Sequence, residues 1–190
     1  SRHHPAPNPA SLAFRFGCAA TYVLHFVVMM LRDGSRKLSG TILATIFGLF
    51  MAFNIGGNDV ANSFGTSVGA GTLTIRQALA VAAIFEVSGA MIAGGAVTDT
   101  IRKGIVSTEV LADPHLALVG ALSALLASAL WVSFATWKSL PVSTTHSIVG
   151  SMIGFGVMAG GISVINWMKL GGIVASWIIS PFFAFIIAFF

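Results

Sequence analysis

The sequence predicts an all-α, polytopic transmembrane protein, and its composition and its long apolar stretches support this. Of the 190 residues, 56% are hydrophobic and only 8% are charged, whereas soluble domains carry about 25% charged residues. A surface so poor in charge suits lipid rather than water as its surroundings. The formal net charge of +4 includes no basic cluster, which argues against nucleic acid as a partner and leaves membrane lipid as the expected one.

Four stretches are apolar and long enough to cross a bilayer, which takes about 20 residues per helix. They are residues 12–31, 77–97, 115–137 and 169–190, and the last is expected to kink at Pro181. Two further apolar stretches, residues 41–55 and 147–160, are short. Residues 41–55 would extend about 22 Å as a helix, less than the hydrocarbon core of about 30 Å. Short spans beside polar segments are typical of interrupted or re-entrant helices.

The ends of the chain differ from its middle. Residues 1–11 are rich in proline and histidine and are expected to form a disordered tail. Residues 12–40 are interpreted as an additional N-terminal span followed by a basic loop at 32–37. Residues 41–190 form the main transmembrane unit. Because the chain stops at Phe190 inside an apolar run, we expect this unit to be truncated at its C-terminus.

The first polar segment, residues 56–62, contains the carboxylate of Asp59 between Asn58 and Asn62. Further hydroxyls follow at Ser63, Thr66 and Ser67. An ionised carboxylate at membrane depth costs several kcal/mol unless it is compensated. If the preceding helix ends here, its carbonyl end adds partial negative charge. The segment then suits Na⁺, with Asp59 and Asn62 as candidate metal ligands, or a proton carried by Asp59. A polar loop with Asp59 in water explains the same residues equally well.

The second polar segment, residues 141–146, is predicted to open a helix. Pro141 disfavours continuation of the preceding span, and Ser143 or Thr144 is a suitable N-cap. The first turn then offers free N–H groups, the hydroxyls of Ser143, Thr144 and Thr145, and the positive end of the helix dipole, which together suit an oxyanion. His146 adds a donor that titrates near neutral pH. Ordinary capping of a buried helix, with His146 packed against it, accounts for the same residues.

Glu86 lies in the middle of the apolar stretch 77–97. An acid within a transmembrane segment is a functional hypothesis by default. We therefore consider Glu86 a candidate coupling group for Na⁺ or a proton, with pairing to Arg102 or Lys103 as the alternative. The nearby glycines at 89, 94 and 95 fit close helix packing.

Both polar segments resemble signatures of the PiT family of inorganic phosphate transporters. The first signature is GNDVANSFGTSVG at residues 57–69, and the second is PVSTTHSIVG at residues 141–150. The similarity runs from about residue 41 to the end and includes TIRQA at 74–78 and IRKGI at 101–105. The first forty residues do not contribute to it.

This resemblance implies symport of inorganic phosphate with Na⁺ or H⁺ across a membrane, expected to be the plasma (inner) membrane. It also implies two inverted repeats, each supplying both motifs to a central site. The implied phosphate ligands are Asn58, Ser143, Thr144 and Thr145. The implied cation or coupling groups are Asp59, Asn62 and Glu86, and Ser63, Thr66, Ser67 and His146 are additional candidates. No cofactor is expected apart from the coupling ion.

The chain holds one copy of each motif, so the resemblance assigns it half of a site. The missing half would come from a longer protein, which we favour, or from a second copy in a homo-oligomer. Alternative functions are transport of sulfate or another oxyanion, and a non-transporting membrane fragment or scaffold. An intramembrane hydrolase using Ser143 and His146 is disfavoured, because no Gly-x-Ser-x-Gly motif surrounds Ser143. We therefore do not expect an enzyme.

Overall fold

The computed structural model describes residues 36–190, without the side chains of residues 36–38, 102 and 103. Within this part, the elements are α2 (Arg36–Gly69), α3 (Ile75–Gly104), η1 (Val110–Ala112), α4 (Pro114–Trp137), α5 (Thr144–Gly160), η2 (Ile162–Val164) and α6 (Trp167–Phe189). The predicted tail at 1–11, the predicted span at 12–31 and most of the predicted basic loop lie outside the described residues. Helix α2 begins at Arg36 and runs through residue 41. The predicted boundary between the N-terminal segment 12–40 and the main unit 41–190 stays a prediction.

Four of the described helices are long and apolar enough to cross a membrane. These segments are Ser39–Gly69, Ile75–Ile101, Pro114–Trp137 and Trp167–Phe189. The predicted all-α polytopic fold and the spans predicted at 77–97, 115–137 and 169–190 are therefore confirmed. The last of these continues as a helix through Pro181. In contrast, α5 has 17 residues and extends about 26 Å, shorter than a hydrocarbon core of about 30 Å.

The predicted break at residues 56–62 is wrong. Helix α2 continues without interruption from Arg36 to Gly69. The first signature at residues 57–69, called the first motif below, is therefore helical, as the signature at 141–150, the second motif, is from Thr144 onward. The carbonyl end of α2 lies at Gly69 rather than beside Asp59. Adjacent glycines at 56 and 57 disfavour a helix by about 1 kcal/mol each. Hydrogen bonds from the motif to α4 and α5, described below, offset this local preference. The second predicted interruption is confirmed, because a non-helical connection at 138–143 separates α4 from α5.

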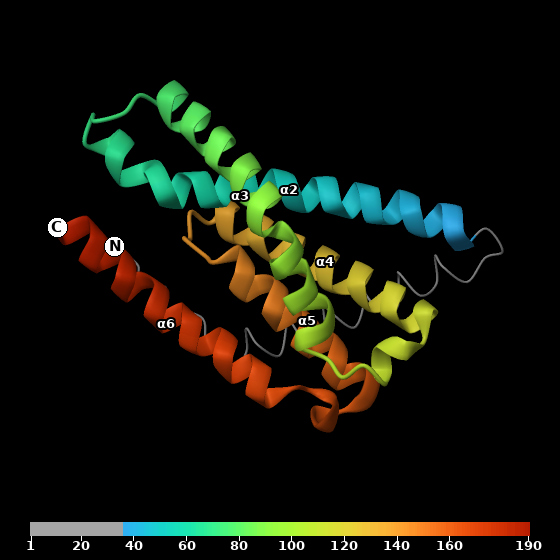
Figure 1. Cartoon of the computed structure of the whole chain (residues 1–190). Coiled ribbons are helices and arrows are strands. Elements are labelled where there is room, and N and C mark those ends of the chain that lie inside the picture. Colours follow the sequence, from blue (N-terminus) through green and yellow to red (C-terminus); the bar gives the residue numbers. More distant parts are fainter. Residues whose placement is uncertain (1–35) are drawn as a thin grey trace, which may run out of the picture.

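Helices α2, α4 and α5 form the packed centre of the described chain (Figure 1). Helices α2 and α4 run side by side in the same direction, with Phe47 of α2 against Val119 and Leu122 of α4. About one turn further along α2, Met51 packs against Ala129 and Val132 of α4. Helix α5 returns antiparallel to α4 (Figure 1).

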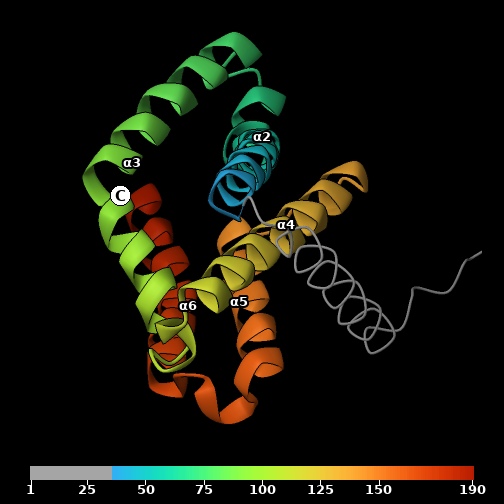
Figure 2. The same ribbon diagram turned by 90° about the vertical axis from the view of Figure 1, so that its right-hand side faces the viewer.

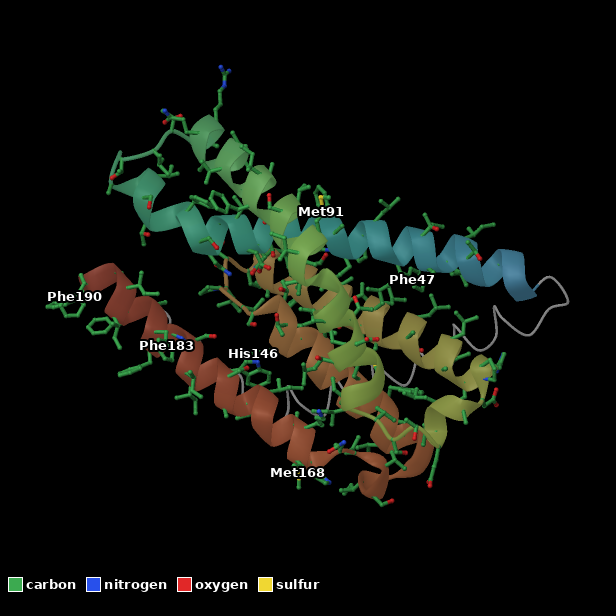
Figure 3. All side chains as sticks on the ribbon, viewed as in Figure 1. Phe47, Met91, His146, Met168, Phe183 and Phe190 are labelled. Atoms are coloured by element: carbon green, nitrogen blue, oxygen red, sulfur yellow. The ribbon has the colours of Figure 1, made fainter. Side chains whose placement is uncertain are left out.

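Helices α3 and α6 lie on the outside of this centre (Figure 2). Of the most apolar window in each, 6% is buried in α3 and none in α6. Their surfaces carry large exposed apolar side chains such as Met91, Ile92, Phe183 and Phe189, and Figure 3 shows Met91 and Phe183 projecting away from the ribbon. Such surfaces suit lipid or further protein.

The connection that follows α3 is paired with the connection that precedes α6. Val106 and Ile165 form an antiparallel bridge. Ser107 N donates to Val164 O over 2.8 Å, and Asn166 N donates to Ile105 O over 2.9 Å. In an apolar environment backbone groups must find partners within the protein, and this pairing satisfies them. It ties the end of α3 to the start of α6.

Close packing between α4 and α5 gives the first testable prediction. A methyl group added at Gly120 of α4 would overlap the ring of Phe155 on α5. We expect Gly120→Ala to lower the free energy of unfolding by about 1–3 kcal/mol, because an overpacked core must shift. Thermal unfolding in detergent measures this. The control is Gly120→Ala combined with Phe155→Leu, which should be less destabilised than the sum of the two single variants. An unchanged unfolding temperature for Gly120→Ala would contradict the packing.

Candidate functional site

Three asparagines lie on one side of α2, spaced four residues apart at 54, 58 and 62. Residues at this spacing share one face of a helix. Asn58 Nδ2 donates to Thr136 Oγ1 on α4 over 3.0 Å. Asn62 Nδ2 donates to Asn58 Oδ1 over 2.8 Å. Asn58 is only 3% exposed, so these bonds satisfy an amide that would otherwise be buried without partners. The face thus connects the first motif to the C-terminal end of α4.

Asp59 connects the first motif to the second. Thr144 Oγ1 donates to Asp59 Oδ2 over 2.9 Å. Beside this bond, Asn62 Nδ2 donates to the Val142 carbonyl over 3.3 Å. Thr144 is buried and Asp59 is half-buried, and among the described side chains no ion pair compensates the Asp59 carboxylate. The two motifs, more than eighty residues apart in sequence, therefore meet at a carboxylate and a hydroxyl.

The N-terminus of α5 is capped by Ser143, one of the two predicted candidates, the other being Thr144. Ser143 is the N-cap residue, with extended backbone, and its Oγ accepts a hydrogen bond from His146 N over 3.2 Å. Ser147 Oγ donates to the Ser143 carbonyl over 2.9 Å. Thr145 is exposed in the same turn. The first turn of a helix carries partial positive charge and unpaired N–H groups, so this end of α5 favours an anion.

A hollow of about 380 Å³ opens beside this helix end. Its lining residues are Trp131, Pro141, Val142, Ser143, His146 and Ser147. On its α6 side, the ring of His146 contacts the ring of Trp177 at a centroid distance of 3.7 Å, and Figure 3 shows His146 between α5 and α6. The hollow and the Asp59 contact lie at the same turn of α5. Thr144 bonds to Asp59, while Ser143 and His146 line the hollow.

The remaining predicted site residues are not joined to this arrangement by any hydrogen bond among the described residues. Glu86 is exposed on α3, and the side chains of Arg102 and Lys103, its partners in the alternative interpretation, are not described. Ser63 and Thr66 are exposed and Ser67 is half-buried, all in the last turns of α2. Their roles stay predictions.

Three polar residues of these contacts were not predicted from the sequence, namely Asn54, Ser133 and Thr136. Asn54 lies in the apolar stretch at 41–55, and the other two lie in the apolar stretch at 115–137. The available signal was spacing. Asn54 precedes Asn58 by four residues, and Ser133 precedes Thr136 by three, so each pair shares a helix face.

The Ser143 cap can be tested by substitution. We expect Ser143→Ala to lower the free energy of unfolding by about 1 kcal/mol, because Ala cannot accept the hydrogen bond from His146 N. Ser143→Asn keeps an acceptor at this position and should retain most of the stability. Denaturant titration of both variants makes the comparison. Equal stability of the Ala and Asn variants would show that Ser143 does not cap α5.

The sequence of this chain is similar to those of known phosphate transport proteins. Residues 55–190 match the phosphate transporter family. A Mycobacterium bovis protein provisionally named a phosphate permease is 51% identical over 185 residues, which cover 92% of this chain and 33% of that protein. An Arabidopsis thaliana protein named inorganic phosphate transporter 2-1, chloroplastic, is 48% identical over 145 residues, covering 76% of this chain and 25% of that protein.

The likeness extends to three dimensions. A solved structure described as the sodium-dependent phosphate transporter matches with a TM-score of 0.70 and 50% identity, covering 75% of this chain and 36% of that chain. This chain thus spans between 25% and 36% of the length of these three proteins. The predicted resemblance is confirmed, as is the expectation of a transporter relative rather than an enzyme. The chain belongs to the phosphate transporter family.

Proposed function

We propose that this chain takes part in Na⁺-coupled symport of inorganic phosphate. The observation that carries the proposal is the hydrogen bond from Thr144 Oγ1 to Asp59 Oδ2, because it joins the acidic motif on α2 to the anion-attracting end of α5. The Na⁺ coupling is supported by the similar solved structure, which is described as a sodium-dependent phosphate transporter. A proton coupled through Asp59 is the competing form of the same proposal.

The proposed cation site is centred on Asp59. Its carboxylate lies inside a membrane-spanning helix, and such a charge is expected to have a compensating partner. A small cation supplies that partner without another ionised side chain. The carboxylate and the Thr144 hydroxyl are oxygen ligands already in contact. Asn62 lies three residues further along the same helix as Asp59 and would supply an amide oxygen. Glu86 on α3 remains a proposed coupling group, and Ser63, Thr66 and Ser67 remain additional candidates for the cation.

The proposed phosphate site is the first turn of α5 and the hollow beside it. Ser143, Thr144 and Thr145 supply hydroxyls, and the N–H groups of the turn face the anion. His146 lines the hollow and provides one further donor. The volume of about 380 Å³ exceeds that of several water molecules at about 30 Å³ each. Asn58 is proposed as an indirect phosphate residue, since its amide is already bonded to Thr136 and Asn62.

The Thr144 hydroxyl suggests how the two sites are coupled. A hydroxyl has one proton to donate and two lone pairs that accept. Without a cation the proton is donated to Asp59. A cation bound by both Asp59 and the Thr144 oxygen would repel that proton and turn it away from the carboxylate. The same proton would then be available to phosphate, while the cation cancels the repulsion between the carboxylate and the anion. Cation binding therefore precedes and strengthens phosphate binding in this proposal.

The proposed site needs a second pair of motifs, because this chain supplies one copy of each. We assign that pair to a further part of the native protein, arranged as an inverted repeat, with a second copy of this chain as the alternative source. The proposed location is the plasma (inner) membrane.

Uptake measurements test the proposed function. The native protein in proteoliposomes should accumulate radiolabelled phosphate when an inward Na⁺ gradient is imposed, and excess sulfate should not compete. Uptake driven by a pH gradient alone would replace Na⁺ with H⁺ as the coupling ion. Competition by sulfate would change the substrate to a broader class of oxyanions. Absence of phosphate uptake by correctly folded protein would contradict transport and favour a scaffold.

The proposed coupling predicts a specific effect of Thr144. Thr144→Val keeps the single methyl group of Thr and replaces the hydroxyl with a second methyl. The Na⁺ concentration for half-maximal phosphate uptake should therefore rise by roughly tenfold, as expected for a lost bond to a charged group. Thr144→Ser retains the hydroxyl and should stay close to the native value. Thr145→Val is the matched control, because Thr145 is the exposed neighbour and should alter the KM for phosphate alone. An unchanged Na⁺ dependence in Thr144→Val would exclude this coupling.

A further inference from the structure

We propose that Asn54 and Ser133, which lie outside both motifs, are positioning residues that fix the register of α2 against α4 and thereby hold Thr144 at Asp59. This inference rests on the proposed function, because the site that it positions is the proposed cation and phosphate site. It assigns a role to two residues in apolar stretches of the sequence.

The hydrogen bonds of Asn54 use both ends of its amide. Ser133 Oγ on α4 donates to Asn54 Oδ1 over 2.6 Å. Asn54 Nδ2 donates to the Phe50 carbonyl of its own helix over 2.7 Å. The second bond orients the amide, so its oxygen faces α4. Asn54 is 5% exposed, and a buried amide in an apolar helix that lost Ser133 would be left with an unpaired acceptor.

Apart from the Asn58–Thr136 hydrogen bond, the packing of α2 against α4 near this pair is apolar. Phe47 packs against Val119 and Leu122, and Met51 packs against Ala129 and Val132. Apolar packing has little directional preference, and in lipid no hydrophobic force selects one register over another. A slip of one helical turn moves a residue by about 5.4 Å, which would break every hydrogen bond between the helices. Directional bonds at Asn54–Ser133 and Asn58–Thr136 therefore oppose such a slip.

A change of register in α4 would reach the site directly. Helix α4 ends at Trp137, and a short connection at 138–143 leads to Thr144. This connection is bonded tightly to the end of α4, since Lys138 N donates to Phe134 O over 3.0 Å and Leu140 N donates to Ala135 O over 2.8 Å. Thr144 therefore follows the end of α4, and the Asn54–Ser133 bond lies one turn before that end.

The experiment is a double-mutant cycle on phosphate uptake by the native protein in proteoliposomes. Asn54→Leu and Ser133→Ala should each raise the KM for phosphate by about threefold or more, the range expected for an interhelical hydrogen bond in a membrane. The double variant should be no worse than the more affected single variant, because both remove the same bond. The maximal rate per folded protein should change less than the KM.

The matched control is Ser123→Ala. Ser123 is a buried serine on the same helix whose hydroxyl has no hydrogen-bond partner among the described residues, and its removal should leave the KM unchanged. An exchange variant, Asn54→Ser with Ser133→Asn, keeps one amide and one hydroxyl between the same two helices. Its KM for phosphate should be lower than that of Asn54→Leu or of Ser133→Ala.

Two results would overturn the inference. One is a KM in Asn54→Leu and Ser133→Ala equal to that of the Ser123→Ala control. The other is strictly additive effects in the double variant together with no recovery in the exchange variant. In both cases native protein would still transport phosphate, so this failure is distinct from failure of the proposed function, in which native protein shows no uptake.

Discussion

A carboxylate in a membrane-spanning helix is costly unless something compensates it, and Asp59 places this constraint on the whole chain. The described structure meets it in part with a hydrogen bond from Thr144 and with the positive end of α5, which begins at the same residue. The negative charge itself has no ion-pair partner among the described side chains. A cation from solution would compensate it, and this need is the physical basis of the proposed coupling.

The rest of the bundle keeps the two motifs within reach of each other. Helix α4 is the intermediary, because it packs along α2 and then leads through the short connection at 138–143 to α5. Hydrogen bonds at Asn54 and Asn58 make the α2–α4 contact directional. Apolar packing of α4 against α2 on one side and against α5 on the other buries further surface. At the opposite end, the Val106–Ile165 bridge joins the connections that carry α3 and α6. Helices α3 and α6 carry exposed apolar surfaces, whereas the polar site lies among the inner helices α2, α4 and α5.

The sequence was sufficient for the elements whose signals are local. Three predicted spans and the Ser143 cap are confirmed, since hydropathy over about 20 residues and cap chemistry depend on neighbouring residues alone. The predicted break at 56–62 is wrong, and Asn58 and Asp59 in this segment bond to partners far along the chain, at Thr136 and Thr144. Asn54 and Ser133 escaped prediction for the same reason, since a single polar residue in an apolar stretch gains its meaning from the helix opposite. The contact of Thr144 with Asp59 required the arrangement in space.

Equilibrium binding gives the most direct test of the central claim that cation and phosphate sites meet at Thr144 and Asp59. Radiolabelled phosphate binding to the purified native protein should be measured over a series of Na⁺ concentrations, with Na⁺ binding measured over a series of phosphate concentrations. The account predicts that each ligand raises the affinity for the other by the same factor, as linkage requires. A phosphate affinity that does not change with Na⁺ would contradict it.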